Sequence, residues 1–520
     1  MIPGSDVGTF WRLVCQAAER HPDRVLLADD HGRSLTGASL RETGEVVAAG
    51  FDALGIGPGS RVSWQLPTTL EAMVVMVALA RLGAVQNPVI PVMRERDVAL
   101  VVDQVNAEFL LVPEEWRGFA HGAMARDLAT SRDLRVVICD HATDPSTLGG
   151  ALRLPAGDPA TLPAPGDPAS GDVRWIYHSS GTTSVPKGIQ HTDRSVMASA
   201  SGVVNMLDVR ADDVFPLAIP VSHIGGMAML TASLVKGMRL VCFDVFDPAT
   251  TPERMAAHGP TVLGSAVPFF LAFMAAQQRH GSAPLYPRLR IGVAGGAPLP
   301  VEVCRAVRET LGISGICNSW GLTEVPVITF ATPRDPADVL DRTVGRPNPG
   351  VEVRAVGDDE QVLPPGAEGE LRVKGPQTFV GYVDPALDVE AFDADGFFRT
   401  GDVGVVEADG RIRVTGRLKE IIIRNAENIS ALEVEELLFR YPGVVDVAVI
   451  GVPDPRTVER VCAVIVAEPG TDVSLETIVA YCKRAGMTPF KIPERVEVVD
   501  EIPRNALGKA LKNDLRARFG

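Results

Sequence analysis

The chain has 520 residues, 46% hydrophobic and 22% charged, a composition typical of a globular protein with about two to four structural units. Its 65 acidic and 50 basic residues give a net charge of −15, so the surface as a whole is expected to repel nucleic acid and anionic membranes. No run of about 18 uncharged apolar residues is present to span a bilayer, and the N-terminus lacks a basic, apolar secretion signal, so we expect a cytoplasmic protein.

The seven cysteines are odd in number, widely scattered and mostly set among apolar neighbours. They lie at positions 15, 139, 242, 304, 317, 462 and 482. This pattern predicts reduced core thiols rather than a disulfide framework, and no Cys/His cluster has the spacing of metal ligands.

From residue 50 to about 250 the sequence alternates helix-like stretches with short β-branched strands, which is α/β patterning. Strands are predicted over Arg61–Trp64, Phe109–Val112 and 134–139, each bounded by Gly or Pro. The apolar stretch 72–80, which we expect to end at Arg81, predicts a buried helix. Residues 141–172 are rich in Pro, Gly, Ala and Asp and are expected to run as a loop over the surface.

Beyond residue 340, glycine turns and short strands predict a small β-rich subdomain, with strands over 351–356, 369–374 and 411–415. After Gly416 a separate unit of about 100 residues begins, a size at which a domain can fold alone. Its first helix is predicted from a capping box, Ser430 with Glu433, and an apolar face. That face comprises Val434, Leu437, Leu438 and Tyr441, and the later elements are strands over 444–451 and 460–467, a helix over Leu475–Arg484 and a strand over 495–499.

The predicted fold class is therefore mixed α/β and α+β. We expect a large N-terminal domain of α/β subdomains with a small β-subdomain, followed by a small α+β C-terminal domain. No internal repeat is visible in the sequence.

A loop typical of phosphate binding follows a predicted strand over 173–177. It contains Ser179, Ser180, Gly181, Thr182, Thr183 and Lys187. Glycine lets backbone N–H groups approach an anion, the hydroxyls add donors, and the lysine supplies a point charge for a polyphosphate. The loop is not a Walker motif, which needs Gly-Lys followed directly by Ser or Thr. By composition alone, a solvated turn is an equal alternative.

Seven segments in a fixed order carry a resemblance to a known family. They are residues 179–188, 220–226, 295–298, 320–324, 400–402, 416–419 and 503–509. In these segments, which extend over nearly the whole chain, the sequence resembles the adenylate-forming enzymes: acyl-CoA synthetases, stand-alone adenylation domains and luciferases. It is most similar to an acyl-CoA synthetase.

The resemblance implies two half-reactions. The carboxylate of an acid attacks the α-phosphate of ATP to give acyl-AMP and pyrophosphate, and the thiol of coenzyme A then takes the acyl group and releases AMP. ATP, Mg²⁺ and coenzyme A are expected, because displacement at phosphorus depends on positioning and charge neutralisation. The resemblance also implies an N-terminal domain over residues 1–416 and a mobile C-terminal domain over 417–520, which rotates about a hinge near Lys419.

The resemblance implies roles for individual residues. Glu324 is expected to bind Mg²⁺, Asp402 to accept from the ribose hydroxyls, and Trp320 to stack on the adenine. Arg417 is expected to meet the ribose or α-phosphate, and Lys509 to bridge the acyl carboxylate and the α-phosphate. The other nucleotide-binding residues are expected to be Ser179, Ser180, Gly181, Thr182, Thr183, Lys187, Gly295, Gly296, Ala297, Asn318, Ser319, Gly321 and Thr323, the last also with a catalytic role. Each of the first five has an ordinary alternative, such as a surface charge, a turn-stabilising aspartate or a core aromatic.

The acyl pocket is expected around His223, which by resemblance gates it and takes part in catalysis. A packed histidine is the alternative. Gly225, Gly226, Met227 and Val267 are expected beside it. No aspartate lies in residues 218–223 to pair with an α-amino group, so we expect a plain carboxylic acid with a hydrophobic acyl, alicyclic or aryl group.

The thiol tunnel departs from the family pattern, because Asn425 and Ala426 stand where a Gly-Gly pair is usual. The methyl group of Ala426 is expected to narrow the tunnel. Thiolation is therefore less firmly predicted than adenylation.

Three alternatives to an acyl-CoA synthetase stay open: a ligase that loads the phosphopantetheine of an acyl carrier protein, a luciferase-like oxygenase, and a non-catalytic acyl-nucleotide sensor. A sensor would be expected to lack Lys509, Glu324 or Asp402, and all three are present. A carrier protein and a second copy of the chain, forming a homodimer, stay open as partners.

Overall fold

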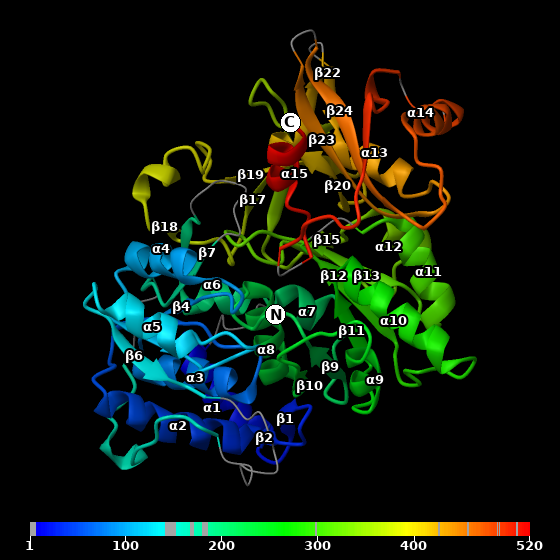
Figure 1. Ribbon diagram of the computed structural model, residues 1–520. Helices are drawn as coiled ribbons and strands as arrows, with labels where there is room; N and C mark the ends of the chain where they lie inside the picture. The colour runs from blue at the N-terminus through cyan, green and yellow to red at the C-terminus, as the bar shows by residue number, and fades with distance from the viewer. Residues whose placement is uncertain are drawn as a thin grey trace.

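The computed structural model describes residues 7–140, 152–166, 171–178, 186–296, 299–424, 427–454, 457–485, 487, 489–505 and 508–520. The strands of these residues form five sheets. In Figure 1 the elements after Arg417 gather in a small body, coloured orange to red, beside the larger remainder of the chain. The mixed α/β architecture of the prediction is confirmed.

The largest sheet carries the phosphate-loop region. In spatial order it contains β18 (Gly381–Tyr382), β8 (Gly188–His191), β7 (Trp175–His178), β4 (Val85–Pro88), β3 (Arg61–Trp64), β5 (Phe109–Val112) and β6 (Arg135–Ile138). The strands from β7 to β6 run parallel, and β8 and β18 add antiparallel at one edge. The crossovers are α3 (Leu70–Leu82), α4 (Glu95–Val105) and α5 (His121–Ala129), which confirms the predicted α/β alternation.

Two further sheets complete the α/β part. One has the order β2 (Ser34–Thr36), β1 (Val25–Asp29), β10 (Arg239–Cys242), β9 (Val214–Leu217). The other has the order β11 (Val262–Ser265), β12 (Ile291–Gly295), β13 (Ile316–Trp320), β14 (Thr329–Phe330), β15 (Arg346–Pro347). The helices are α1 (Phe10–Arg20), α2 (Gly37–Ala53), α6 (Asp193–Ala198), α7 (Ser201–Asn205), α8 (Ile224–Lys236), α9 (Thr251–Ala256), α10 (Val267–His280), α11 (Val301–Leu311) and α12 (Ala337–Arg342). Because β12 and β13 are parallel, Gly295 and Ser319 pair at the same edge of their sheet.

Helix α3 is buried as predicted, but it does not end at Arg81. It begins after the cap Thr69, whose hydroxyl accepts from the Ala72 N–H, and ends at Leu82, followed by Gly83 in the left-handed conformation. Arg81 stays inside the helix because its guanidinium donates to the Pro163 carbonyl at 2.7 Å. The buried guanidinium thus has a hydrogen-bond partner in the described segment 152–166, which lies between β6 and β7 in the sequence.

The β-rich subdomain and the C-terminal unit use separate sheets. The first sheet contains β16 (Glu352–Val356), β17 (Glu368–Lys374), β19 (Phe398–Val406) and β20 (Ile412–Arg417), all antiparallel. The second contains β22 (Glu427–Ser430), β21 (Ile421–Arg424), β24 (Val458–Ala467) and β23 (Val444–Asp454), with β25 (Arg495–Val498) paired to β24. Helices α13 (Ala431–Leu438), α14 (Leu475–Arg484) and α15 (Lys512–Phe519) cover it. A 3₁₀ turn, Leu418–Glu420, joins the two sheets.

The predicted capping box at α13 is only half formed. The Ser430 hydroxyl accepts from the Glu433 N–H at 3.3 Å, but the Glu433 carboxylate pairs with Lys491 instead of returning to Ser430. The Ser430 hydroxyl also donates to the Thr415 carbonyl at 2.7 Å. The long-range ion pair and this link to β20 replace the second half of the local motif.

The described parts of the predicted surface loop, residues 152–166 and 171–172, contain one short 3₁₀ turn, Pro159–Thr161. This loop packs on α2, since Gly157 donates to the Val46 carbonyl. All seven cysteines are free, and six of them are buried, as predicted for core thiols.

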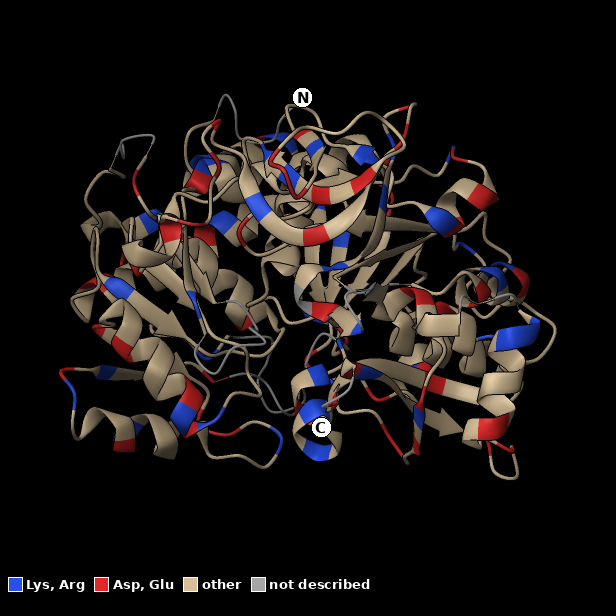
Figure 2. Ribbon diagram, turned by 90° about the horizontal axis from the view of Figure 1, so that it is seen from above, with Lys and Arg blue, Asp and Glu red and all other residues tan. Residues whose placement is uncertain are grey.

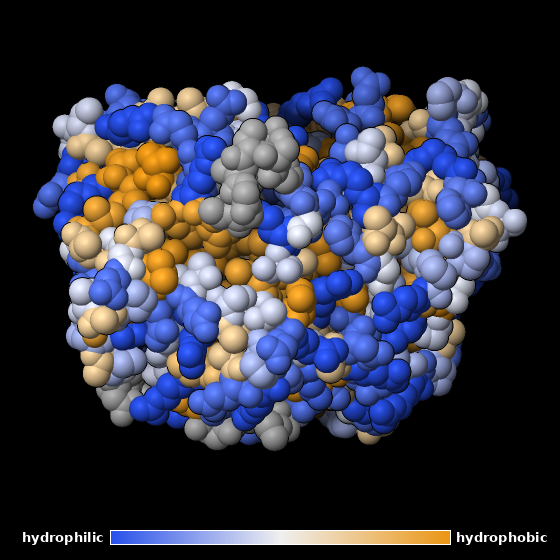
Figure 3. All heavy atoms as spheres, turned by 90° about the horizontal axis from the view of Figure 1, so that it is seen from below, coloured by the Kyte–Doolittle hydropathy of each residue, from blue (hydrophilic) through white to orange (hydrophobic). Residues whose placement is uncertain are grey.

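Figure 2, a ribbon seen from above, shows positions of Lys and Arg interspersed with positions of Asp and Glu throughout the fold. The opposite face, in Figure 3, mixes hydrophilic surface with apolar patches. An anionic substrate must therefore be met by a local group of cations rather than by the field of a whole face. Among the residues that the structure describes, no helix has both the length and the apolarity needed to cross a membrane.

Candidate active site

A cavity of about 1650 Å³ opens where the β11–β15 sheet, the β16–β20 sheet and the C-terminal unit meet. It exceeds the roughly 300–1,000 Å³ of an ordinary small-molecule pocket, so it has room for a nucleotide and a second substrate. Nine of the predicted site residues line it: Val267, Gly296, Asn318, Ser319, Trp320, Gly321, Asp402, Arg417 and Lys509. Segments far apart in the sequence thus contribute to one site.

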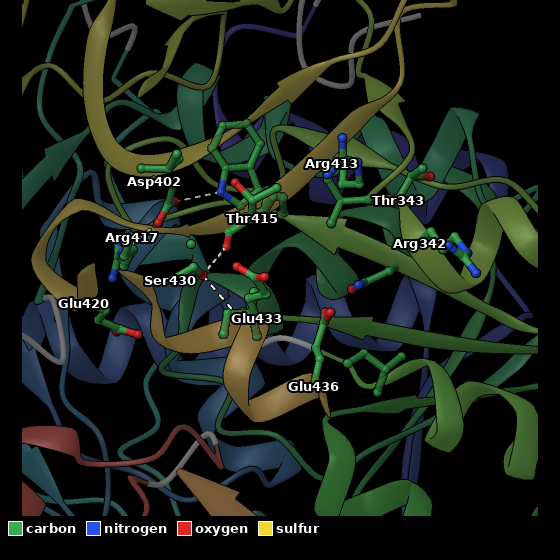
Figure 4. A pocket seen from close by; sticks show the side chains of 18 of the residues that line it. Arg342, Thr343, Asp402, Arg413, Thr415, Arg417, Glu420, Ser430, Glu433 and Glu436 are labelled. Atoms are coloured by element: carbon green, nitrogen blue, oxygen red, sulfur yellow. Dashed lines mark hydrogen bonds and ion pairs between the residues drawn. The ribbon is translucent and has the colours of Figure 1, made fainter. Parts of the chain in front are cut away.

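Asp402 is held between two donors at the wall of this cavity. The indole N–H of Trp320 donates to one carboxylate oxygen at 2.8 Å, and the Arg417 guanidinium donates to the other at 2.6 Å (Figure 4). The Thr400 hydroxyl accepts from the Asp402 N–H, which fixes the backbone as well. Each carboxylate oxygen keeps a further lone pair, so a pair of vicinal hydroxyls can still be bound. The fixed indole edge also sets the plane of the Trp320 ring.

Lys509 enters the cavity from the C-terminal unit. The preceding Gly508 is left-handed (φ +81°), and a Cβ atom there would lie 3.5 Å from Pro268 and 3.7 Å from Ala266. The loop therefore lies against the start of α10, beside Val267. Burial, and then the nearby Arg417, lower the pKa of the Lys509 ammonium below its usual range, while Glu420 opposes the shift. A partly desolvated cation at this place can act strongly on anions bound beside it.

A buried ion cluster lies under Lys509. Lys512 contacts Glu420 at 3.1 Å and Glu435 at 2.8 Å, and Glu420 also lies 3.9 Å from the Lys509 ammonium. Burial alone would lower the Lys512 pKa, but the two carboxylates outweigh it and raise the pKa. The sequence analysis did not identify these residues, because their partners are more than 70 positions apart or on different elements.

Glu324 is buried, and its carboxylate accepts from the Tyr382 hydroxyl at 2.8 Å. Tyr382 is the one side chain bonded to this carboxylate in the described part of the chain, so one oxygen stays available for a cation. A single protein carboxylate combined with substrate phosphates is how Mg²⁺ is commonly held. The Glu324 environment therefore fits the magnesium ion that the resemblance implies.

Thr323, next to Glu324, is fixed through its backbone. Its carbonyl accepts from Nε2 of His191 at 2.8 Å, which places the histidine proton on that nitrogen. Burial lowers the pKa of His191 to about 4, so the ring is neutral near pH 7. His191 ends β8, and the contact therefore links the phosphate-loop sheet to the Thr323–Glu324 segment.

His223 is the N-cap of α8, and its Nδ1 accepts from the Gly225 N–H at 3.1 Å. It lines a second, small cavity together with His178, Ser222 and Thr323. Burial lowers the His223 pKa to about 4, so a neutral ring with its proton on Nε2 faces this cavity. His223 therefore caps α8 and also lines a cavity. Its expected role as the gate of an acyl pocket stays a prediction.

The other predicted site residues divide into two groups. Gly225, Gly226 and Met227 form the first turn of α8, where Met227 is fully buried and a Cβ on Gly226 would lie 2.7 Å from the Cα of Val221. Gly295 ends β12. Outside the described residues lie Ser179, Ser180, Gly181, Thr182, Thr183, Ala297, Asn425 and Ala426, and the side chain of Lys419 is likewise not described. Their expected roles stay predictions.

Comparison with known proteins places this site in a family. The family model "AMP-binding enzyme" matches residues 14–383, and "AMP-binding enzyme C-terminal domain" matches residues 433–509. A medium-chain fatty-acid–CoA ligase from Escherichia coli is 30% identical, covering 98% of this chain and 90% of its own. A salicyl-AMP ligase/salicyl-S-ArCP synthetase from Mycobacterium tuberculosis is 33% identical, covering 98% and 91%. The solved structure of the amide bond synthetase McbA from Marinactinospora thermotolerans matches with a TM-score of 0.84 at 28% identity, covering 98% and 99%.

The chain belongs to the AMP-binding enzyme family, the adenylate-forming enzymes. It is an acid–thiol ligase that activates an acyl group, as the seven sequence segments predicted.

Proposed function

We propose that the chain converts a hydrophobic carboxylic acid, ATP and coenzyme A into acyl-CoA, AMP and pyrophosphate through a bound acyl-adenylate. The observation that carries this proposal is the meeting of Lys509 with Trp320, Asp402 and Arg417 in one cavity. Trp320, Asp402 and Arg417 would bind the nucleotide. Lys509, from the C-terminal unit, would supply a cation that moves with that unit.

In the first half-reaction the carboxylate must approach the α-phosphate, which is itself an anion. Lys509 and Arg417 would place two positive charges beside these groups, in a cavity where water screens them less than in bulk. Asp402, held by Trp320 and Arg417, would fix the ribose and so the position of the α-phosphate. Glu324 would hold Mg²⁺, which neutralises phosphate charge when bound.

In the second half-reaction Lys509 has no anion pair left to bridge. The 3₁₀ turn Leu418–Glu420 joins two separate sheets and is the proposed hinge, with Lys419 at its centre. Rotation there would withdraw Lys509 and bring the β21–β22 hairpin to the cavity for the thiol. The domain division at residues 416 and 417 is part of this proposal.

The acyl group is proposed to be hydrophobic, because apolar residues such as Val267 and Ile224 line the two cavities. The names of two similar proteins support this class, since one is a medium-chain fatty-acid–CoA ligase and another a salicyl-AMP ligase. A fatty, alicyclic or aryl acid is therefore tested first.

The acceptor has two alternatives to coenzyme A. The salicyl-S-ArCP synthetase among the similar proteins supports a carrier-protein phosphopantetheine. The presence of Asn425-Ala426 in place of two glycines, which is expected to narrow the tunnel for the thiol, favours the same alternative. The amide bond synthetase adds an amine as a third acceptor to test.

The test is pyrophosphate release with ATP and Mg²⁺ across a panel of fatty, alicyclic and aromatic acids. Each acid is run alone, with coenzyme A, with a phosphopantetheinylated carrier protein and with an amine. Acid-dependent release that turns over with coenzyme A and yields acyl-CoA supports the proposal. Turnover only with the carrier protein, or only with the amine, would show that this compound and not coenzyme A is the acceptor. The absence of any acid-dependent pyrophosphate release would favour the non-catalytic sensor.

A further inference from the structure

Tyr382 lies between two charged groups of the proposed nucleotide site. We propose that Tyr382 is a positioning residue for the first half-reaction: its hydroxyl orients the Glu324 carboxylate toward Mg²⁺, and its ring face holds the Lys187 ammonium toward the ATP phosphates. The proposal rests on the proposed function, since it takes Glu324 as the metal ligand and Lys187 as a phosphate ligand.

The hydroxyl side of this arrangement is a short hydrogen bond in a buried place. The Tyr382 hydroxyl donates to Oε1 of Glu324 at 2.8 Å, and both side chains are less than one-tenth exposed. Burial, and then the adjacent Glu324, raise the pKa of Tyr382 well above its usual range, so the hydroxyl keeps its proton and stays a donor. A donor fixed on one oxygen leaves the other oxygen in a defined direction.

The ring side faces the phosphate loop. The ammonium of Lys187 lies 5.1 Å from the centroid of the Tyr382 ring, within the range of a cation–π contact. The ring also has an apolar contact, since Phe379 packs against it edge-on at 4.9 Å between ring centroids. The ring is therefore held in place independently of its hydroxyl.

The backbone fixes both contacts to the same frame. Strand β18, which carries Tyr382, pairs with β8, which begins directly after Lys187. The Gln190 side chain donates to the Tyr382 carbonyl at 2.7 Å, and the Glu324 carbonyl accepts from the Phe379 N–H at 2.9 Å. The segment from Phe379 to Tyr382 thus joins the metal-ligand segment to the exit of the phosphate loop.

In this proposal Tyr382 would set the spacing between a metal ion held by Glu324 and the Lys187 ammonium. In a reaction whose catalysis is mainly positioning and charge neutralisation, the two cations must reach the polyphosphate together. Tyr382 makes no contact with reacting atoms in this proposal. It acts through Glu324 and Lys187.

The experiment measures ATP binding to the full chain by calorimetry without any carboxylic acid, so that no turnover occurs. Each variant is titrated once with excess Mg²⁺ and once with EDTA, and the ratio of the two affinities reports the metal-dependent part. Tyr382→Phe keeps the ring and removes the hydroxyl, so it is expected to reduce this ratio about tenfold while leaving the affinity in EDTA within about twofold. Tyr382→Leu, which also removes the ring face, is expected to weaken binding in EDTA as well.

Tyr441→Phe is the matched control, because the Tyr441 hydroxyl donates to the Asp472 carbonyl at 2.8 Å in the C-terminal unit and Tyr441 does not line the cavity. It is expected to change neither affinity. A double-mutant test uses Glu324→Gln. In that background Tyr382→Phe is expected to have no further effect on the ratio of the ATP affinities in Mg²⁺ and in EDTA.

Two results would overturn the inference, and they are distinguishable. If the wild-type chain gains no affinity from Mg²⁺, the proposed metal site fails and the Tyr382 role with it. If the wild-type chain shows the gain and Tyr382→Phe keeps it within about twofold, the metal site stands and the Tyr382 role alone is rejected.

Discussion

Replacing Lys509 with alanine is expected to slow acyl-adenylate formation far more than thioester formation. Lys509 brings its charge into the cavity beside Arg417. Among the residues that the structure describes, its nearest carboxylate is Glu420 at 3.9 Å, so none of them holds the ammonium in a tight pair. Lys512 cannot replace it, because that side chain is held by Glu435 at 2.8 Å and by Glu420 at 3.1 Å. The variant therefore loses one of two cations from a weakly screened site.

The magnitude follows from comparable losses. Removing one group that stabilises charge in a transition state costs about 2.7–4 kcal/mol, which is about 10²–10³ in rate. Transfer from supplied acyl-AMP to coenzyme A has no carboxylate–phosphate repulsion to offset, so it is expected to change by less than about threefold.

The assay measures the two half-reactions separately: single-turnover pyrophosphate release from acid and ATP, and acyl-CoA formation from supplied acyl-AMP. Lys483→Ala is the control, since it removes an exposed lysine from the last turn of α14. Equal losses in both half-reactions would refute the role given to Lys509, and so would a loss of less than about tenfold in the first.

Three further predictions concern charge. Glu420→Gln removes a carboxylate that raises the Lys509 pKa. Because the adenylation rate is expected to fall when Lys509 loses its proton, the alkaline limb of the pH–rate profile should move to lower pH in this variant. An unchanged profile would contradict the prediction. Arg440 of the C-terminal unit pairs with Glu302 of α11 at 2.7 Å. Arg440→Gln is expected to lower the ratio of the adenylation rate to the thioester-transfer rate by up to about fivefold, because an exposed ion pair contributes at most about 1 kcal/mol. Burial lowers the His191 pKa to about 4, so the folded state loses stability as pH falls below about 6.5. In urea unfolding at pH 7 and pH 5, the fall in unfolding free energy between the two pH values is expected to be about 2 kcal/mol smaller in His191→Gln than in the wild type. An equal fall in both proteins would reject this role of His191.

Local patterns were sufficient for many of the elements. The strands Arg61–Trp64 and Phe109–Val112 and the helix Leu475–Arg484 have the predicted bounds, because β-branched runs and a 3.6-residue apolar period act within one element. The predictions were wrong where a distant partner competes with a local signal. Arg81 continues α3 because Pro163 accepts from it, and Glu433 leaves its capping box for Lys491.

The site divides in the same way. Trp320, Asp402, Arg417 and Lys509 were predicted from their motifs, and the structure brings them to one cavity. Tyr382 was missed, as were Glu420, Glu435 and Lys512, because a tyrosine or a salt-bridge partner carries no local signal of its role. Their partners lie on other elements and become neighbours only after folding.

The order of the motifs along the chain was enough to predict the family, the two-part organisation and which charged residues belong to the site. Each motif is a contiguous run of residue types suited to phosphate, ribose or carboxylate, so it can be recognised without the fold. Only the tertiary structure decided which charges face each other and which are neutralised. Lys509 is loosely paired and Lys512 tightly paired, although they lie three positions apart, because only Lys512 contacts Glu435. Burial and distance, which determine what a charge can do, are properties of the folded chain.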